Sequence, residues 1–421
     1  MYQKTTLDSG LRVISSNMPH TRSACICIFI GAGSRYESAA EAGLSHFIEH
    51  LCFKGTQRRA TAREISEAIE GVGGLLNAGT DRELTYYWAK VARQHYSLCL
   101  NVLVDMLRNS KFEPEELEKE RKVIIEELNR CLDSPSERVD MLIDELVWPD
   151  QALGRDVAGS RETVSKLSRE MVLSYLGSQY GPTSAVVSVA GNIDHDEVVA
   201  SVAETFAGWP QATPRPWYPV EGEQASARSR VETRPTEQAH LCLAVPGVSL
   251  LHPDRFTLDL LNVVLGEGMS SRLFLEVREK RGLAYAVHSF VSHFMDSGAV
   301  TIYAGVDPQR LEGAVGAILG ELAWLREERV PGLELTKAKE MAKGRMLLRM
   351  EDTMSVARWL GAQELLMGRI LTVDDVLAIV DAITAEDIQR VAGDLLLSTK
   401  LNLAVVGPLD KEANLQALLK L

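Results

Sequence analysis

The sequence predicts an α+β protein built from two homologous α/β domains, and three observations support this prediction. Strand-like and helix-like segments are mixed without the strict strand–helix–strand rhythm of a doubly wound parallel sheet. A proline-rich stretch interrupts the chain near its middle, and the sequence ends in the same pattern on both sides of it. The length of 421 residues is also too great for one ordinary core and suits two or three domains.

Local patterns place strands and helices along the chain in an order that fits this class. Apolar runs predict strands at residues 11–15, 24–30, 85–91, 185–190, 299–304 and 401–406. Apolar residues at helical spacing predict helices at residues 61–69 and 95–107.

The same succession of helix, strand and turn closes both halves of the chain. Ser168 in the first half and Thr384 in the second are suited to cap the start of a helix. An apolar run and a glycine turn follow each helix, namely Gly191-Asn192-Ile193-Asp194 and Gly407-Pro408-Leu409-Asp410. The matched positions share one offset, since 384 − 168, 407 − 191 and 410 − 194 all equal 216. A constant offset through three kinds of element indicates an internal duplication.

The proline-rich stretch is the predicted linker between the two copies. It contains Gly222, many polar residues and five prolines, which are Pro210, Pro214, Pro216, Pro219 and Pro235. We therefore expect a first domain at residues 1–209, a linker at 210–235 and a second domain at 236–421.

The composition excludes several classes of function. A formal net charge of −13 argues against a nucleic-acid partner, which calls for a basic surface. No window of eighteen uninterrupted apolar residues predicts a membrane span, and the N-terminus has no apolar core of a secretory signal. The six cysteines are scattered in mostly apolar contexts, which predicts buried free thiols and a cytoplasmic protein.

The segment Gly43–Leu51 carries the pattern that points to chemistry. On a helix its apolar and polar residues occupy opposite faces, with Leu44, Phe47, Ile48 and Leu51 on one and His46, Glu49 and His50 on the other. Histidines at positions i and i+4 can reach one metal ion, and the carboxylate of Glu49 lies beside them. This is the zinc-protease histidine pair in reverse order, and it predicts zinc bound by His46 and His50 with Glu49 as the general base.

A catalytic zinc needs a third protein ligand, and a helix at residues 116–128 offers two glutamates on one face. Glu120 and Glu127 are two turns apart and flank apolar positions of this helix. Glu126 points instead to a face of basic residues, formed by Lys119, Lys122 and Arg130. A carboxylate on an apolar side must be paired or bound to a metal, so Glu127 is the expected ligand. Glu120 is expected to support a ligand from behind.

With these residues placed, the chain resembles the pitrilysin family of inverted zinc peptidases, which includes the mitochondrial processing peptidase. The family pattern is His-x-x-Glu-His followed, after 76 residues, by Glu, and here residues 51–126 are those 76. The flanking sequences match as well, at residues 31–37, at Phe53-Lys54-Gly55-Thr56 and at residues 120–124. The short bacterial members that are similar to the processing peptidase resemble this chain most.

The resemblance implies an architecture and a substrate-binding apparatus. It implies two homologous domains, each a sheet with helices on one face, and two chains paired as a clamshell around a closed chamber. It further implies that Asn77 and Ala78 lie on an edge strand that binds the substrate, and that Arg278 and Tyr285 bind it from the second half. The second half carries no inverted motif at the equivalent place, so one Zn²⁺ per chain is expected.

The predicted function is that of a zinc-dependent endopeptidase acting on short or unfolded polypeptides. The alternative is a catalytically silent partner subunit of a heterodimeric processing-type peptidase, which would be expected to lack Glu49 or a ligand. A one-domain metal hydrolase of small molecules is a further alternative, against which the duplication speaks. Pairing with itself or with a paralogous chain is left open by the sequence.

Overall fold

The computed structural model describes residues 2–409 and 415–421, so Asp410 of the second glycine turn lies outside the described residues. The chain forms two compact units. The first comprises Met1–Leu128, Asp156–Tyr218 and Leu347–Thr372, and the second comprises Asn129–Arg155, Pro219–Met346 and Val373–Leu421. Each unit thus includes a segment from the opposite half of the sequence, and a single cut at the linker does not separate them. The domain boundaries predicted from the sequence, at residues 209 and 236, therefore stay a prediction of where the two duplicated halves meet.

The first unit is built on a six-stranded sheet, which we call sheet 1. Its strands follow the order β1-β2-β6-β3-β5-β4. Only β2 and β6 are parallel, and the other neighbours are antiparallel. The strands are β1 (Tyr2–Thr6), β2 (Arg12–Asn17), β3 (Ser23–Ile30), β4 (Leu75–Thr80), β5 (Thr85–Ala92) and β6 (Ala185–Gly191).

The second unit is built on a five-stranded sheet, which we call sheet 2, with the order β7-β11-β8-β10-β9. Its one parallel pair is β7 with β11. The strands are β7 (Arg228–Thr233), β8 (Ala239–Pro246), β9 (Ala284–His293), β10 (Gly298–Val306) and β11 (Asn402–Gly407).

The two sheets confirm that the units share one topology. The order β2-β6-β3-β5-β4 in sheet 1 is matched by β7-β11-β8-β10-β9 in sheet 2. The register is conserved too, because Arg12 pairs with Val186 and Arg228 pairs with Asn402, and both 228 − 12 and 402 − 186 equal 216. The offset that the glycine turns predicted therefore extends to strand pairing.

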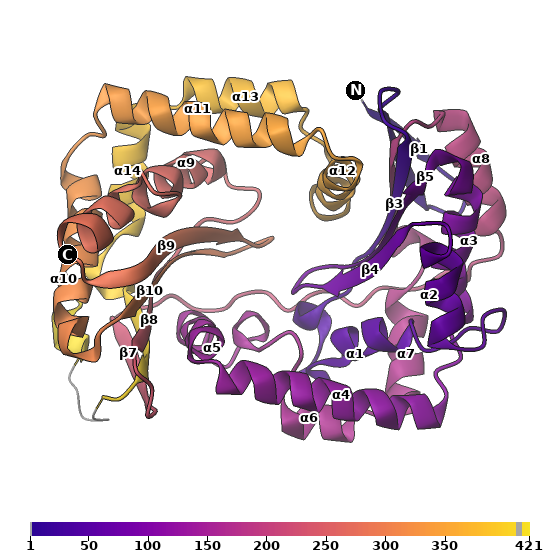
Figure 1. The fold of residues 1–421 in the computed structure, drawn as a ribbon, viewed down its shortest axis with the longest axis horizontal. Helices are drawn as coiled ribbons and strands as arrows, with labels where there is room; N and C mark the ends of the chain where they lie inside the picture. Colours follow the sequence, from indigo (N-terminus) through magenta and orange to yellow (C-terminus); the bar gives the residue numbers. More distant parts are fainter. Residues whose placement is uncertain (1, 410–414) are drawn as a thin grey trace. The chain divides into compact units, whose positions relative to one another are not determined.

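Sheet 1 is covered by helices on both faces (Figure 1). Strand β3 alternates between two cores, with Ile26 and Ile28 on one side and Cys27 and Phe29 on the other. The larger layer consists of α1 (Leu44–Leu51), α2 (Ala62–Glu70), α3 (Tyr96–Asn109), α4 (Pro114–Asp133), α6 (Arg161–Lys166), α7 (Arg169–Gln179) and α8 (His195–Thr205). The opposite face carries the single helix α12 (Thr353–Met367).

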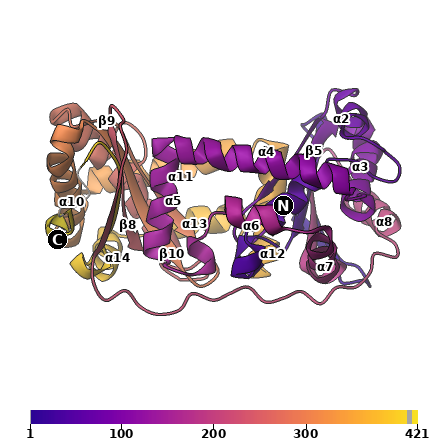
Figure 2. The same cartoon turned by 90° about the horizontal axis from the view of Figure 1, so that it is seen from below.

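Sheet 2 has the same arrangement within its own unit (Figures 1 and 2). The larger layer consists of α9 (Arg255–Gly266), α10 (Leu311–Glu327), α11 (Gly332–Arg349) and α14 (Ala385–Leu395). Helix α13 (Val373–Ala382) contacts α9. The opposite face carries α5 (Pro135–Val147), which packs on β8 and β11.

The helices α5 and α12 are counterparts, and each belongs to the unit built from the other half of the sequence. Their capping residues Ser134 and Asp352 are related by a similar offset, since 352 − 134 equals 218. Helix α12 lies close to sheet 1 because Gly361 has no side chain, and a Cβ there would come within 2.2 Å of the Phe29 ring. The expectation of helices on one face thus holds for the larger layers, and one exchanged helix per sheet is added.

The predicted linker is partly a strand. Its last part, Arg228–Thr233, forms β7 because it pairs along its length with β11. Within the earlier part, Tyr218 accepts a hydrogen bond from the guanidinium of the fully buried Arg35, which also lies 4.2 Å from the ring centroid of Trp217. This segment is therefore anchored to the first unit by specific contacts.

Other local expectations are confirmed. The hydroxyl of Ser168 accepts a hydrogen bond from the Met171 amide and that of Thr384 from the Asp387 amide, so both residues cap helices. All six cysteines are free thiols, five of them buried and Cys131 half-buried. No helix among the described residues has the length and apolar character needed to cross a lipid bilayer.

Candidate metal centre

Helix α1 presents the inverted motif from one face. Its apolar residues Leu44, Phe47, Ile48 and Leu51 are buried in the core of the first unit, whereas His46, Glu49 and His50 are only partly buried. The helix begins at Gly43 with a φ of 95°, a conformation that favours glycine. A Cβ at Gly43 would also lie 2.5 Å from the carbonyl oxygen of Ala158, so no other residue fits without movement.

A buried carboxylate caps this helix. Gly43 offers no side chain for capping, and the amides of Gly43 and Ser45 donate instead to Glu37, at 2.8 and 2.6 Å. Glu37 is fully buried. An anion at a helix N-terminus satisfies unpaired amides and complements the helix dipole, so Glu37 fixes the start of the helix that carries the motif. The local sequence does not predict this role, although Glu37 ends the segment 31–37 that matches the family.

Helix α4 supplies the two glutamates. Leu117, Ile124 and Leu128 are buried on its inner face, and Glu120 is buried beside them. Glu126 is exposed on the outer face, as the helical phase predicted. Val123, an apolar residue of the same helix, is 48% exposed and lies outside the buried face.

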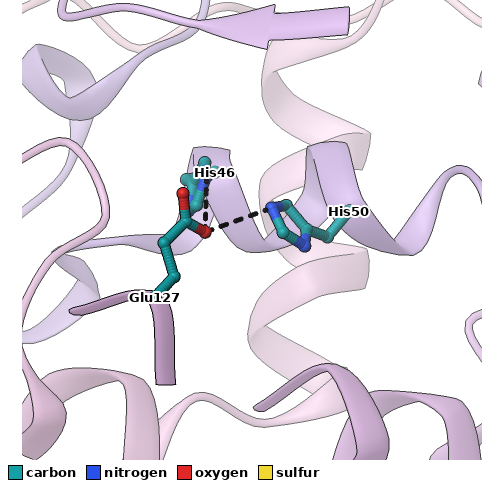
Figure 3. Close-up of side chains that lie close together, drawn as sticks. All are labelled: His46, His50 and Glu127. Atoms are coloured by element: carbon teal, nitrogen blue, oxygen red, sulfur yellow. Dashed lines mark ion pairs between the residues drawn. The ribbon is translucent and has the colours of Figure 1, made fainter. Parts of the chain in front are cut away.

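Glu127 lies against both histidines of the motif. Its Oε2 atom is 3.9 Å from Nε2 of His46 and 3.8 Å from Nε2 of His50 (Figure 3). Within the described residues, these three form the one group of metal-binding side chains whose ligand atoms all lie within 4.8 Å of one another. The structure thus brings together the three residues predicted to bind zinc.

The geometry and chemistry of this group fit a zinc ion. Bonds of about 2.0–2.2 Å from zinc to nitrogen and oxygen allow two donors on one ion to be at most ~4.3 Å apart. The separations of 3.9 and 3.8 Å between Glu127 and the two histidines are shorter than this limit. Burial, assisted by the neighbouring His50, lowers the pKa of His46 to about 4. His46 is therefore neutral at pH 7, the form in which imidazole binds metal.

A carboxylate and an ammonium group lie behind His50. Oε2 of Glu120 is 3.2 Å from Nδ1 of His50, and Oε1 of Glu120 is 2.7 Å from Nζ of Lys54. Burial alone would raise the pKa of Glu120, but the hydrogen bonds with His50 and Lys54 outweigh it and the pKa is lowered. An anionic Glu120 accepts the Nδ1 proton of His50 and so leaves Nε2 free for a metal.

Glu49 lies on the same face of α1 as the two histidines and is held by a residue of β4. The hydroxyl of Thr80 donates to Oε2 of Glu49 at 2.6 Å. Burial raises the pKa of Glu49 above its ordinary value, and this hydrogen bond offsets part of the rise. Thr80 is a second residue that the sequence analysis did not single out, although it closes the segment that contains Asn77 and Ala78.

Asn77 and Ala78 lie on the edge strand of sheet 1. They pair with Trp88 and Tyr87 of β5, and β4 is the last strand of the sheet. The opposite edge of β4 faces no further strand of the sheet. Because Thr80 on this strand contacts Glu49, the edge lies next to the candidate site.

Arg278 and Tyr285 belong to the second unit, where they contact each other. The Arg278 guanidinium carbon lies 5.1 Å from the ring centroid of Tyr285 and 4.7 Å from that of Phe274. Arg278 is part of the π-helical segment Phe274–Lys280, and Tyr285 follows in β9, with a side chain that is 76% exposed. Gly282 between them has a φ of 60°, a left-handed conformation that favours glycine at the end of the helical segment. Their participation in the metal site stays a prediction.

The second unit has a different set of residues at the positions equivalent to the motif. The offset of 216 carries His46, Glu49 and His50 to Asn262, Leu265 and Gly266 on α9. A Cβ at Gly266 would lie 2.2 Å from the Ser289 hydroxyl on β9, so a histidine is excluded there without rearrangement. Close packing of helix and strand occupies the place that the second histidine has in the first unit.

Comparison with known proteins identifies the family of this chain. The family model described as Insulinase (Peptidase family M16) matches residues 12–161, and the model described as Peptidase M16 inactive domain matches residues 166–342. The fold is that of a two-domain protein whose first half carries the candidate metal ligands, and the chain belongs to peptidase family M16. The predicted membership of the pitrilysin-type family is thus confirmed.

Its relatives include bacterial proteins named as zinc proteases. An uncharacterized zinc protease of Streptomyces coelicolor is 39% identical over 419 residues, covering 98% of this chain and 91% of the relative. The uncharacterized zinc protease YmxG of Bacillus subtilis is 36% identical over 411 residues, covering 97% and 98%. A protease from Helicobacter pylori has the same fold, with a TM-score of 0.92 at 22% identity and coverage of 97% and 99%.

Proposed function

We propose that this chain is a zinc-dependent endopeptidase that cleaves short or unfolded polypeptides bound along the edge of β4. The observation that carries the proposal is the convergence of His46, His50 and Glu127 within 4.8 Å, with Glu49 on the same helix face. Names of relatives as zinc proteases support zinc as the metal. One Zn²⁺ per chain is proposed because the equivalent helix of the second unit lacks the donor set.

Each residue of the site has a proposed task. When bound, zinc polarises the substrate carbonyl and lowers the pKa of water at the site toward about 7. Glu49 takes the proton of the attacking water and delivers it to the leaving amine nitrogen. Thr80 restrains the Glu49 carboxylate through Oε2, and Glu120 keeps His50 in the tautomer whose Nε2 faces the metal.

The substrate is proposed to bind as an added strand. The outer edge of β4 is proposed to bind an extended peptide, which completes such an edge with main-chain hydrogen bonds. At this strand the Ala78 amide donates to Oδ1 of Asn77 at 2.8 Å, a contact that a bound peptide would replace. Because Thr80 of this strand also holds Glu49, a peptide on β4 runs past the general base. Arg278 and Tyr285 are proposed to bind the carbonyl end of the substrate and to stabilise the oxyanion.

The presence of Glu49, His46, His50 and Glu127 argues against a silent partner subunit, because such a chain is expected to lack the base or a ligand.

Pairing with a second copy or with a paralogue is proposed from the family resemblance, and light scattering after size exclusion tests it.

The decisive experiment is a digestion assay on the purified chain with and without a chelator. Unstructured peptides are expected to be cleaved, cleavage to stop with the chelator and to return with added zinc. A stably folded protein is the matched control and is expected to be cleaved much more slowly, because strand addition needs an extended backbone. Absence of cleavage in a zinc-loaded protein, or equal cleavage of the folded control, contradicts the proposal.

A further inference from the structure

We infer that Lys54 is a positioning residue of the metal centre, which holds Glu120 against His50 and keeps this carboxylate from becoming a metal ligand. The inference rests on the metal site of the proposed function. It addresses a question that the sequence raises, because Glu120 and Glu127 lie on the same face of α4 and carry the same side chain.

The contacts of Glu120 divide its two oxygen atoms between two partners. Oε1 lies 2.7 Å from Nζ of Lys54, and Oε2 lies 3.2 Å from Nδ1 of His50. The Glu120 side chain is 5% exposed, so its oxygens have little access to water. Each oxygen of this buried carboxylate thus has a partner, and the Lys54 contact defines which one faces the histidine.

Glu127 has a different environment. Among the described residues its ion-pair contacts are with His46 and His50 alone, and its side chain is 38% exposed. No lysine or arginine in the described part of the chain competes for its carboxylate. Lys54 lies beside Glu120, and within the residues that the structure describes no such cation lies beside Glu127. Because Lys54 partly neutralises the Glu120 carboxylate, a metal ion is attracted more strongly to Glu127.

The backbone places Lys54 for this task. Its amide donates to the Leu51 carbonyl at 3.1 Å, directly after α1 ends. The next residue, Gly55, has a φ of 133°, and a Cβ there would lie 2.4 Å from the Ala60 carbonyl oxygen. Thr56 then donates to the buried Asp105 at 2.6 Å. The Lys54 side chain therefore projects from a turn whose backbone is held by contacts before and after it. Only 27% of this side chain is exposed.

Removal of Lys54 has a specific physical consequence. Oε1 of Glu120 would lose its partner in a site that water hardly reaches, which is unfavourable for a charged group. The carboxylate would then rotate toward the next cation available, which is the metal, and its hydrogen bond with His50 would be lost. Loss of such an outer contact typically weakens metal binding by about 10- to 100-fold.

The test measures zinc affinity by chelator competition, so that it does not depend on catalysis. Lys54→Met is expected to bind zinc about 10- to 100-fold more weakly than the wild type. Lys54→Arg, which keeps the charge and hydrogen-bond donors, is expected to restore most of this loss. Lys122→Met on the exposed face of α4 is the matched control and is expected to bind zinc like the wild type.

A double variant separates a positioning role from general damage. If Lys54 acts through Glu120, Lys54→Met adds little to the loss already caused by Glu120→Gln. Cobalt in place of zinc provides a spectroscopic signature, because entry of Glu120 into the ligand set of Lys54→Met changes the visible absorption. Unchanged zinc affinity in Lys54→Met, or losses that add fully in the double variant, overturns the inference.

The outcome is distinguishable from failure of the proposed function. A wild-type chain that binds zinc but cleaves no peptide removes the peptidase proposal, while the affinity measurements on Lys54 still stand. A wild-type chain that cleaves peptides while Lys54→Met keeps full zinc affinity removes only the inference about Lys54. If Lys54→Met does not fold, Lys54→Gln provides the same affinity comparison, with retained wild-type affinity again overturning the inference.

Discussion

At the scale of single residues, the site shows how identical side chains acquire different tasks from their neighbours. Glu49, Glu120 and Glu127 are all glutamates within reach of one histidine pair. Glu49 is held by the Thr80 hydroxyl, Glu120 by Lys54 and His50, and Glu127 faces both ligand nitrogens. These differences support a base, an orienting group and a metal ligand, respectively.

Glu49→Gln is expected to bind zinc normally and to lose peptidase activity. The amide keeps the shape and the hydrogen bond of the carboxylate but cannot accept a proton from water. Metal analysis and peptide cleavage on the same preparation check this expectation. Activity above about a hundredth of the wild-type value excludes Glu49 as the general base.

Glu127→Gln is expected to lose both zinc and activity, whereas Glu126→Gln is its matched control and should change neither. The two residues are adjacent, but only Glu127 contacts the histidines and Glu126 is exposed on the other face. Zinc content after dialysis against a weak chelator compares the two. A loss of zinc in Glu126→Gln shows that the assigned ligand is wrong.

Arg278→Ala is expected to keep zinc content and fold while kcat/KM falls by roughly 10²–10³, the typical effect of losing one oxyanion donor. The neighbouring Lys280→Ala is a suitable control, since Lys280 is exposed and pairs with Glu276. Equal kcat/KM in Arg278→Ala and the wild type means that Arg278 only stacks on Phe274 and Tyr285.

At the scale of elements, the function depends on how short helix α1 is held. A helix of eight residues has little stability of its own, so its position must come from tertiary contacts. Its apolar face is buried in the core, and Glu37 holds its first amides from a buried position. The motif is therefore presented by a helix whose start and inner face are both fixed.

Glu37→Ala is expected to weaken zinc binding although Glu37 contacts no metal ligand. Loss of a helix cap costs about 0.5–2 kcal/mol, and here the displaced helix carries both histidines. Ser168→Ala, which removes the cap of α7, is the control with a similar cost in stability but no effect on zinc. Thermal unfolding and chelator competition together distinguish the two variants. Equal zinc affinity in both would show that the cap does not position the motif.

At the scale of the whole molecule, one topology occurs twice, and the candidate metal ligands found among the described residues all lie in the first copy. The strand order and the register of the parallel pair are the same in both units, yet the counterpart helix places Gly266 against Ser289. Duplication thus preserved the sheet, whose packing depends on apolar alternation. The polar face of the helix that carries the motif was free to differ between the copies.

Metal removal is expected to destabilise the first unit alone. Zinc bound only to the folded protein stabilises it by about 4 kcal/mol when its concentration is a thousandfold above the dissociation constant. A chelator should therefore lower the unfolding temperature of one calorimetric transition and leave the other unchanged, and metal analysis should find one zinc per chain. Two zinc ions per chain, or equal shifts of both transitions, contradicts this expectation.

The sequence by itself determined the periodic features of this protein. The helical faces of residues 43–51 and 116–128, the helix caps Ser168 and Thr384 and the offset of 216 depend on local spacing, which is visible in one chain. The convergence of His46, His50 and Glu127 was predictable for the same reason, because each helix could be phased separately and the family spacing joined them.

Only the tertiary structure decided which distant groups meet. Glu37 and Thr80 contact the motif through hydrogen bonds, and Lys54 contacts it through Glu120. Local periodicity indicates none of these contacts, because each joins residues from different elements or turns. The exchange of α5 and α12 between the units likewise depends on which sheet face is left uncovered by the nearer helices. Sequence periodicity reports which side of an element is apolar, whereas the partner of that side is selected by the packing of the whole chain.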